Sequence, residues 1–351
     1  MADGAPSNRA AFLATGNPKC PIELKDAPYT PPGPNELVVK NYAVAVNPVD
    51  VYKQIVGTAL LPYVQYPCVQ GSDLAGQVVE VGSAVSRFVV GDRVIAYAAG
   101  TLAFGNRTAE GAFQHYTVVR ESLAAAIPAS VSYNRACVLP LCFGTAAYGL
   151  FHHDLLALDL PTVPAAAPND QWLVITSGAS SVGTSAVQLA KAAGYEVLST
   201  ASPKNFDLVR RLGAREVFDY HDPGCADAVV SALEGKKLAG AMAINSGGDA
   251  LCAHVLRSTD GVKFIASAGP PPQQGYPGDI KTKYIDILDL GDPDSVVSKI
   301  FRDFVPKALS FGVLVPEPEP CLVGHGLESL QQAYEIRRKG VSAQKIILGL
   351  N

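Results

Sequence analysis

The fold is decided by residues 171–194, QWLVITSGASSVGTSAVQLAKAAG, which predict a buried strand, a tight turn and an amphipathic helix. Trp172 to Ile175 form a short apolar run, as expected of a parallel strand covered on both faces. From Val182 apolar residues recur at helical spacing, and Gly194 offers a left-handed stop. An ordinary strand-helix turn is one interpretation, and a dinucleotide-binding turn is the other.

The turn itself, residues 177–183, is called the nucleotide loop below. Its small side chains let a pyrophosphate approach the backbone, where the helix N-terminus offers free N–H groups and a positive dipole end. The expected cofactor contacts in this loop are Gly178, Ser180, Ser181, Val182 and Gly183. Strands and helices alternate from residue 171 to residue 268, which indicates a doubly wound parallel sheet and favours the dinucleotide interpretation.

The composition is that of a globular protein with two domains. The chain has 351 residues and a formal net charge of −4, with no long basic run, so neither nucleic acid nor a membrane surface is an expected partner. No apolar stretch is long enough to span a membrane, and residues 1–10 carry no secretory signal, so a cytoplasmic location is expected. The seven cysteines contain no C-x-x-C pair, which predicts reduced, mostly buried thiols.

The first 140 residues are rich in short strands, such as 36–40, 76–82 and 113–119, separated by Pro and Gly clusters. A helix is expected over 135–151, another over 295–309, and strands over 283–290 and 345–350. The last strand is expected to return to the first domain. The predicted fold is therefore α/β, with a discontinuous β-barrel domain (1–140 and 310–351) and a Rossmann domain (141–309).

The segment that follows the second strand of the Rossmann domain selects the nucleotide. An acidic residue there binds the adenosine ribose of NAD, whereas a 2′-phosphate requires neutral or basic groups. This segment contains no carboxylate, which favours NADP. The expected contacts are Ser199, Thr200, Ser202 and Lys204, with Tyr220 against the adenosine; a solvated lysine and a structural tyrosine are the alternatives for the last two.

Six motifs carry a family resemblance that covers essentially the whole chain. The protein resembles zinc-independent quinone oxidoreductases of the medium-chain dehydrogenase/reductase superfamily, and also fungal stand-alone enoyl reductases that assist polyketide synthases. The matching motifs are Asn47-Pro-Val-Asp50, Gly71-Ser-Asp-Leu-Ala-Gly76, Gly91-Asp-Arg-Val94, Gly111-Ala-Phe113, the joint from Leu139 to Ala146, and the nucleotide loop. The resemblance implies a GroES-like β-barrel catalytic domain beside the Rossmann domain.

The resemblance also implies site residues. Asn47, Tyr52 and Thr145 are expected around the nicotinamide and the substrate, with Tyr52 binding the substrate carbonyl or supplying a proton; solvent is the alternative proton source. An Asn-Pro turn and a helix cap are the structural alternatives for Asn47 and Thr145. Further cofactor contacts are expected from Pro48, Ser267, Ala268, Gly269 and Lys345. His115, His152 and His153 are expected to serve packing rather than acid catalysis.

No metal is expected. Where zinc alcohol dehydrogenases of the same superfamily carry ligands, this chain has Asn47, Ser72-Asp73 and Cys142, and one thiolate-capable ligand cannot form a tetrahedral zinc site. Without a Lewis acid, reduction of a conjugated C=C bond or of a quinone is easier than alcohol oxidation.

The sequence therefore predicts an NADPH-dependent reductase of an activated alkene in an α,β-unsaturated carbonyl compound, with a place in secondary metabolism. The substrate is a small molecule, with a carrier-bound polyketide among the candidates, and the protein is a monomer or a homodimer. A quinone oxidoreductase is the alternative activity. An NADPH-binding protein with little turnover is the alternative of another class, and a zinc-dependent alcohol dehydrogenase comes third.

Overall fold

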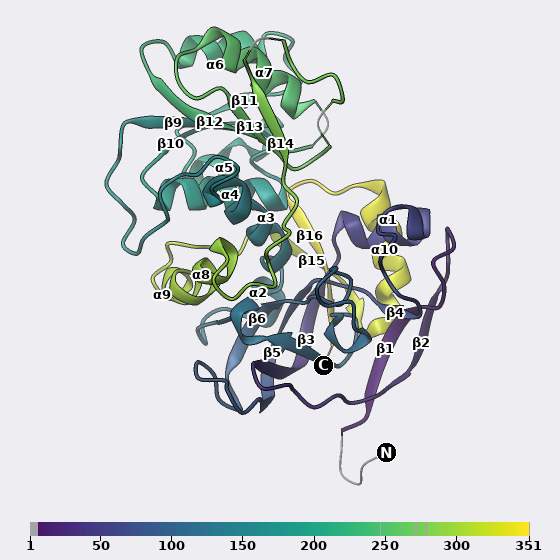
Figure 1. Cartoon of the computed structure of the whole chain (residues 1–351). Coiled ribbons are helices and arrows are strands. Elements are labelled where there is room, and N and C mark those ends of the chain that lie inside the picture. Colours follow the sequence, from purple (N-terminus) through teal and green to yellow (C-terminus); the bar gives the residue numbers. More distant parts are fainter. Residues whose placement is uncertain (1–5, 246, 271, 278, 351) are drawn as a thin grey trace. The chain divides into compact units, whose positions relative to one another are not determined.

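The computed structural model describes residues 6–245, 247–270, 272–277 and 279–350 (Figure 1). The chain forms two compact units. Unit 1 consists of Met1–Leu141, Gly291–Pro293 and Glu319–Asn351, and unit 2 consists of Cys142–Leu290 and Asp294–Pro318. The C-terminal segment thus joins unit 1 from residue 319, whereas the expected boundary lies at residue 310. Residues 294–318 pack in unit 2, where the ring of Phe301 meets that of Phe143 at 5.8 Å.

Unit 1 is built on a mostly antiparallel sheet with the strand order β15-β16-β3-β5-β6-β8, to which β7 adds by pairing with β3. A smaller sheet has the order β2-β1-β4. The strands are β1 Asn8–Leu13, β2 Ile22–Ala27, β3 Glu36–Ala45, β4 Cys68–Val69, β5 Asp73–Val81, β6 Arg93–Tyr97, β7 Tyr116–Arg120, β8 Ala124–Ala126, β15 Glu319–His325 and β16 Gln344–Gly349. The helices are α1 Pro48–Val56, α2 Tyr133–Ala136 and α10 Leu330–Lys339.

Strand β16 lies beside β3 (Figure 1), with Ile347 opposite Ala45 in an antiparallel register. Both strands are almost entirely buried, and their apolar side chains join one core with those of β5 and α10. Burial of such side chains supplies most of the stabilisation of this unit, at about 25 cal/mol for each Å² of apolar surface. The expected return of the last strand to the first domain is therefore observed.

Unit 2 contains a parallel sheet with the strand order β11-β10-β9-β12-β13-β14. Because the first strand of the series lies at the centre and the order runs outward in both directions, the sheet is doubly wound. The strands are β9 Gln171–Ile175, β10 Glu196–Ala201, β11 Glu216–Asp219, β12 Lys237–Ala243, β13 Phe264–Ser267 and β14 Lys281–Tyr284. The helices are α3 Pro140–Phe151, α4 Ser181–Ala192, α5 Phe206–Arg211, α6 Cys225–Ala232, α7 Gly248–Ser258, α8 Val296–Asp303 and α9 Val305–Ser310.

Several expected elements differ from the observed ones for reasons of backbone chemistry. The helix expected over 135–151 is two helices, α2 and α3, because Pro140 has no N–H group and begins a new helix. The helix expected over 295–309 is likewise divided into α8 and α9, with Pro306 in the first turn of α9. Strand β14 ends at Tyr284, so most of the strand expected over 283–290 is irregular. The sequence analysis missed α1 and β15.

Candidate active site

The nucleotide loop connects β9 to α4 in unit 2, and two glycines give it its shape. A Cβ atom at Gly183 would lie 2.2 Å from the carbonyl oxygen of Ser177 and 2.8 Å from the Cα atom of Gly178. A Cβ atom at Gly178 would lie 2.3 Å from Oγ of Ser199 and 2.7 Å from a methyl carbon of Val209. Ser177 itself has a φ of 53°, in the left-handed region. A Cβ atom at position 178 or 183 would clash with these neighbouring atoms, so this tight turn requires glycine at both positions.

Helix α4 begins inside this loop, and its first N–H groups face outward from the helix end. Ser180 caps the helix, because its hydroxyl accepts a hydrogen bond from the N–H of Gly183 at 3.1 Å. In the described part of the chain, no hydrogen bond uses the N–H groups of Ser181 and Val182. Two free donors at the positive end of a helix, beside a tight turn of mostly small residues, suit a phosphate group.

Ser199 and Thr200 lie under the loop and support it. Both side chains are buried; Oγ of Ser199 donates to the carbonyl of Ile175 at 2.6 Å, and Oγ1 of Thr200 accepts from the N–H of Ser177 at 3.0 Å. The N–H of Gly178 also donates to the carbonyl of Thr200 at 2.8 Å. Both hydroxyls thus form hydrogen bonds that support the loop, and the contact with the cofactor expected of Ser199 and Thr200 stays a prediction.

The remaining residues expected near the adenosine stand at the ends of β10 and β11. The hydroxyls of Ser202 and Tyr220 are 2.8 Å apart and form a hydrogen bond. Lys204 is exposed, and the Tyr220 side chain is half exposed. The carboxylate of Asp219, which precedes Tyr220 in the sequence, binds the backbone N–H and the ring of His221 at 3.0 and 2.8 Å. Ser202 and the accessible ammonium group of Lys204 thus follow the second strand, β10, whereas Tyr220, the hydrogen-bond partner of Ser202, follows the third strand, β11.

The end of β13 carries Ser267, Ala268 and Gly269, which were expected beside the nicotinamide. Oγ of Ser267 donates to the carbonyl of Gly269 at 2.7 Å, and the N–H of Ala268 donates to the carbonyl of Ala243 at 2.8 Å. The N–H of Ala268 is thus already used, as is the carbonyl of Ser267, which accepts from the N–H of Ile285 at 2.8 Å; among the described residues no hydrogen bond uses the N–H of Gly269.

Sequence reasoning missed the connection between the loops that follow β9 and β12, the two strands at which the sheet order reverses. Oγ1 of Thr176 donates to the carbonyl of Ile244 at 3.1 Å and accepts from its N–H at 2.8 Å. Asn245, with a φ of 66°, follows Ile244 in this loop. Gly248 also lies close to Thr176, since a Cβ atom at Gly248 would lie 2.5 Å from Oγ1 of Thr176. Ligands of doubly wound sheets bind at such a reversal point. The segment Ile244-Asn245, just before a Gly pair, was the available signal.

In unit 1, Asn47 is the centre of a buried polar triad with Asp73 and Lys345. Nδ2 of Asn47 donates to Asp73 at 2.8 Å, Nζ of Lys345 donates to Oδ1 of Asn47 at 2.6 Å, and Nζ of Lys345 lies 2.9 Å from the Asp73 carboxylate. The carboxylate only accepts and the ammonium only donates, so the amide of Asn47 has a fixed orientation. The side chains of Asp73 and Lys345 are 0% and 4% exposed, and the backbone N–H of Leu141 also donates to Asp73 at 2.6 Å.

A second buried ion pair, between Asp50 and Lys53, lies on α1 next to this triad in the sequence. The two charged atoms are 3.5 Å apart, and both side chains are buried. Asp50 also accepts from the backbone N–H of Asn47 at 2.9 Å, and Nζ of Lys53 donates to Thr101 at 2.7 Å. Burial raises the pKa of Asp50, and the charge of Lys53 opposes that shift. The two pairs together bury two lysine side chains and two aspartate side chains.

The other expected catalytic residues are placed differently. Tyr52 is 57% exposed, on the face of α1 opposite to the buried Asp50–Lys53 pair, and Pro48 is exposed at the start of that helix. Thr145 is half-buried in the second turn of α3, in unit 2, and so does not cap that helix. The structure thus joins Asn47 to Lys345, keeps Tyr52 outside the triad, and places Thr145 in the other unit.

The residues at the positions of zinc ligands have other partners. Asn47 and Asp73 belong to the triad with Lys345, whose ammonium group supplies the positive charge there. Cys142 is buried and not in a disulfide, and the other cysteines in the described part of the chain are also free thiols. An amide that is already doubly hydrogen-bonded and a carboxylate paired with a lysine are poor ligands for a divalent cation.

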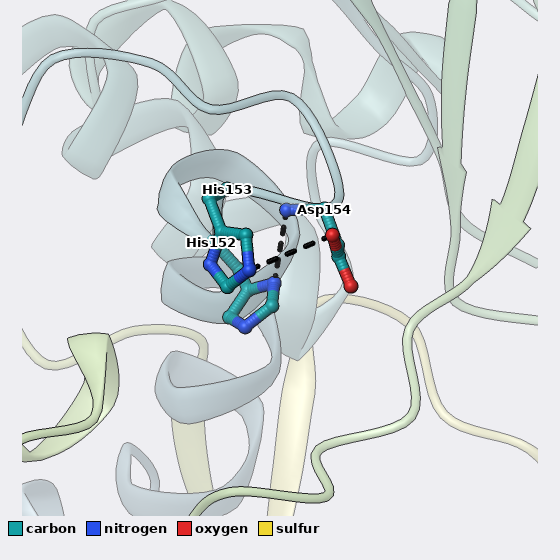
Figure 2. Close-up of side chains that lie close together, drawn as sticks. All are labelled: His152, His153 and Asp154. Carbon is teal, nitrogen blue, oxygen red and sulfur yellow. Dashed lines mark hydrogen bonds and ion pairs between the residues drawn. The ribbon is translucent and has the colours of Figure 1, made fainter.

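Figure 2 shows the group His152, His153 and Asp154, which is the cluster of metal-capable side chains found among the described residues. Nδ1 of His152 accepts from the backbone N–H of Asp154 at 3.2 Å, and the Asp154 carboxylate binds Nζ of Lys283 at 2.9 Å. His152 is buried and its ring stacks on that of Tyr148, with centroids 4.3 Å apart. Burial, and then the neighbouring His153, lower the pKa of His152. Packing and internal hydrogen bonds account for the group; burial likewise lowers the pKa of His115.

No helix in the described residues is long and apolar enough to cross a membrane.

Comparisons with known proteins extend over the whole chain. The alcohol dehydrogenase GroES-like domain matches residues 33–129. Dehydrogenase pigH of Monascus ruber is 44% identical over 371 residues, covering 98% of this chain and 100% of the relative. Trans-enoyl reductase himH of Aspergillus japonicus is 38% identical and covers 90% of both chains.

The solved CurK enoyl reductase has a TM-score of 0.75 at 19% identity, over 99% of this chain and 100% of that one. The quinone oxidoreductase of Pseudomonas syringae has a TM-score of 0.71 at 24% identity, over 98% and 100%. The similarity to these two solved structures, at 19% and 24% identity, shows that the fold is shared.

Proposed function

Because the chain belongs to the medium-chain dehydrogenase/reductase superfamily, we propose that it is an NADPH-dependent, zinc-independent reductase of C=C bonds conjugated to a carbonyl group. The observation that carries this proposal is the triad in unit 1, in which Asp73 accepts from the amide N–H of Asn47 and Lys345 donates to its amide oxygen. With those groups engaged, the site offers no Lewis acid for an alcohol, so a substrate that delocalises its own developing charge is the better acceptor.

The choice of NADPH over NADH rests on unit 2. The nucleotide loop fits a pyrophosphate, since Gly178 and Gly183 allow its tight turn and two N–H donors stand at the start of α4. Lys204 is exposed, and Ser202 and Tyr220 present hydroxyls, at the position where an NAD-binding protein carries an acidic residue. We assign these three residues to the 2′-phosphate and the adenosine.

Bound NADPH would supply a hydride to the β-carbon of the substrate. The chain must then hold the carbonyl oxygen and deliver a proton to the α-carbon. Tyr52 is the residue proposed for this task, because its hydroxyl belongs to an exposed side chain close in sequence to the triad. Asn47 is proposed as a positioning residue that keeps Lys345 oriented, and Thr145 as a contact of the nicotinamide.

Three of the relatives are named trans-enoyl reductases. On that basis we propose that the substrate is an enoyl thioester of a secondary-metabolite pathway, with a polyketide carried by a synthase as the natural form. A cytoplasmic location and a monomeric or homodimeric state complete the proposal.

The test is NADPH oxidation by the chelator-treated protein with a panel of enones, enoyl thioesters and quinones. We expect turnover of an enone or thioester that is unchanged by the chelator, with a higher kcat/KM for NADPH than for NADH. A loss of activity on chelation, or a preference for NADH, would contradict the proposal. Turnover of quinones alone would make the protein a quinone oxidoreductase, and tight NADPH binding without turnover of any acceptor would favour a non-enzymatic role.

A further inference from the structure

Unit 1 contains a pocket between α1 and α10 that has one apolar and one cationic wall. The pocket has a volume of about 280 Å³ and is lined by Pro48, Val51, Tyr52, Ile55, Arg337 and Arg338. The four residues from α1 are spaced i, i+3, i+4 and i+7, so they form one face of that helix. The opposite wall is the last turn of α10, which carries the two arginines.

The charges on the two helices leave this pocket positive. The charged residues of α1, Asp50 and Lys53, are buried and paired with each other, and they do not line the pocket. Among the described residues, no carboxylate lies within ion-pair distance of Arg337 or Arg338. Basic residues in the last turn of a helix are favourable in any case. That favourable interaction with the helix dipole does not require an apolar wall opposite the arginines. Lys339, which lies outside the pocket, would provide it equally well.

We propose that this pocket binds the phosphate end of a 4′-phosphopantetheine thioester, an inference that rests on the proposed reduction of enoyl thioesters. Two adjacent guanidinium groups match a phosphate in charge and in hydrogen-bond geometry. The phosphate of this group is followed directly by a carbon with two methyl branches, which suits the wall formed by Pro48, Val51 and Ile55. A whole dinucleotide would not fit, since the volume lies at the lower end of that of small-molecule sites.

Tyr52 connects this pocket to the proposed chemistry. Its side chain is part of the pocket lining, and it is also the residue proposed to hold the substrate carbonyl. Because the pantetheine arm separates the thioester from the phosphate, the arm must fold back along α1 for Tyr52 to reach the carbonyl of a thioester whose phosphate lies against Arg337 and Arg338. The phosphate has two natural sources, a coenzyme A thioester or an acyl carrier protein, and both present the same phosphopantetheine group.

The experiment compares kcat/KM for one enoyl group presented as four thioesters: those of pantetheine, 4′-phosphopantetheine, coenzyme A and a carrier protein. The variants are Arg337→Glu/Arg338→Glu and, as the matched control on the same helix turn, Lys339→Glu. For the wild type we expect the kcat/KM for phosphopantetheine to exceed that for pantetheine about tenfold, the effect of one charge-assisted contact. The double variant should lose this preference, and Lys339→Glu should keep it within about twofold. A faster reaction of the coenzyme A or carrier form than of the free arm identifies the natural source.

Two further measurements keep the outcomes separate. Calorimetric titration with 4′-phosphopantetheine needs no turnover, so it tests the pocket even if the proposed reaction is wrong; binding by the wild type that the double variant lacks supports the pocket. The proposed pocket would be overturned by equal kcat/KM for the 4′-phosphopantetheine and pantetheine thioesters in the wild type, or by an unchanged preference in the double variant. A parallel loss of NADPH affinity in the double variant would assign the arginines to the cofactor and also overturn it.

Discussion

Substitution of Gly183 by alanine is the sharpest test of the nucleotide loop. The new Cβ atom would lie 2.2 Å from the carbonyl oxygen of Ser177, whereas a carbon and a carbonyl oxygen approach no closer than about 3.3 Å. The clash is with backbone atoms, so no side-chain rotation relieves it. The loop must therefore open by roughly 1 Å, a shift that takes an N–H···O contact of about 2.9 Å out of hydrogen-bond range.

The expected cost follows from that displacement. The loss of one hydrogen bond from Ser181 or Val182 to a charged phosphate removes about 1.5–3 kcal/mol, which raises the Kd for NADPH by about 10- to 150-fold. The strained loop should also lower the free energy of unfolding by about 1–3 kcal/mol. Titration by NADPH fluorescence measures the first effect, and chemical denaturation measures the second.

Gly224→Ala is the matched control. Gly224 also precedes a helix of unit 2, but its φ is −83° and the nearest atom to a new Cβ would be 3.4 Å away, at an ordinary contact distance. This variant should bind NADPH like the wild type. A Gly183→Ala protein that is folded and binds NADPH within about twofold of the wild type would refute the assignment of residues 177–183 to the phosphate.

Four other predictions follow from contacts described above. Lys204→Glu should weaken binding of NADPH much more than that of NADH; equal loss of both in fluorescence titrations would remove the lysine from the phosphate site. Tyr52→Phe should lower kcat for an enone by about 100-fold if the phenol delivers the proton, and an unchanged kcat would assign that step to solvent. Lys345→Met should destabilise unit 1 by about 3–5 kcal/mol, because it leaves the Asp73 carboxylate buried without its partner, and the double variant with Asp73→Asn should recover part of that loss in denaturant titrations. Because the pKa of His152 is lowered by burial in the folded protein, the unfolded chain takes up its proton first; stability should fall as the pH drops below about 6.5, with a shallower slope in His152→Gln.

The architecture of unit 2 was predictable because its signal is local. Each buried strand is a short apolar run, each helix has its own period, and the nucleotide loop lies between the first strand and the first helix. What could not be predicted is the orientation of Ser199 and Thr200. A parallel strand is covered on both faces, so its sequence does not indicate which side chains face the loop above it.

The contacts within the triad of unit 1 could not be predicted from the sequence, for a different reason. Asn47 and Asp73 are separated by 26 residues, and Asn47 and Lys345 by 298, so their contacts depend on how β3, β5 and β16 are placed in the sheet. The resemblance to known reductases named Asn47 and Lys345 separately, and it gave no indication that they touch. The two breaks in predicted helices, at Pro140 and before Pro306, were available from proline chemistry alone.

The pairing of β16 with β3 has a consequence for the order in which the chain folds. As the ribosome makes the protein, β3 emerges early, but its neighbour is synthesised only after all of unit 2. Unit 2 can then be native while unit 1 still exposes an open sheet edge and the buried charge of Asp73 lacks its lysine. Such long-range pairing is slow to form. We therefore regard the nascent chain as most exposed to chaperones and to aggregation at this edge, until residues 344–349 arrive to close it.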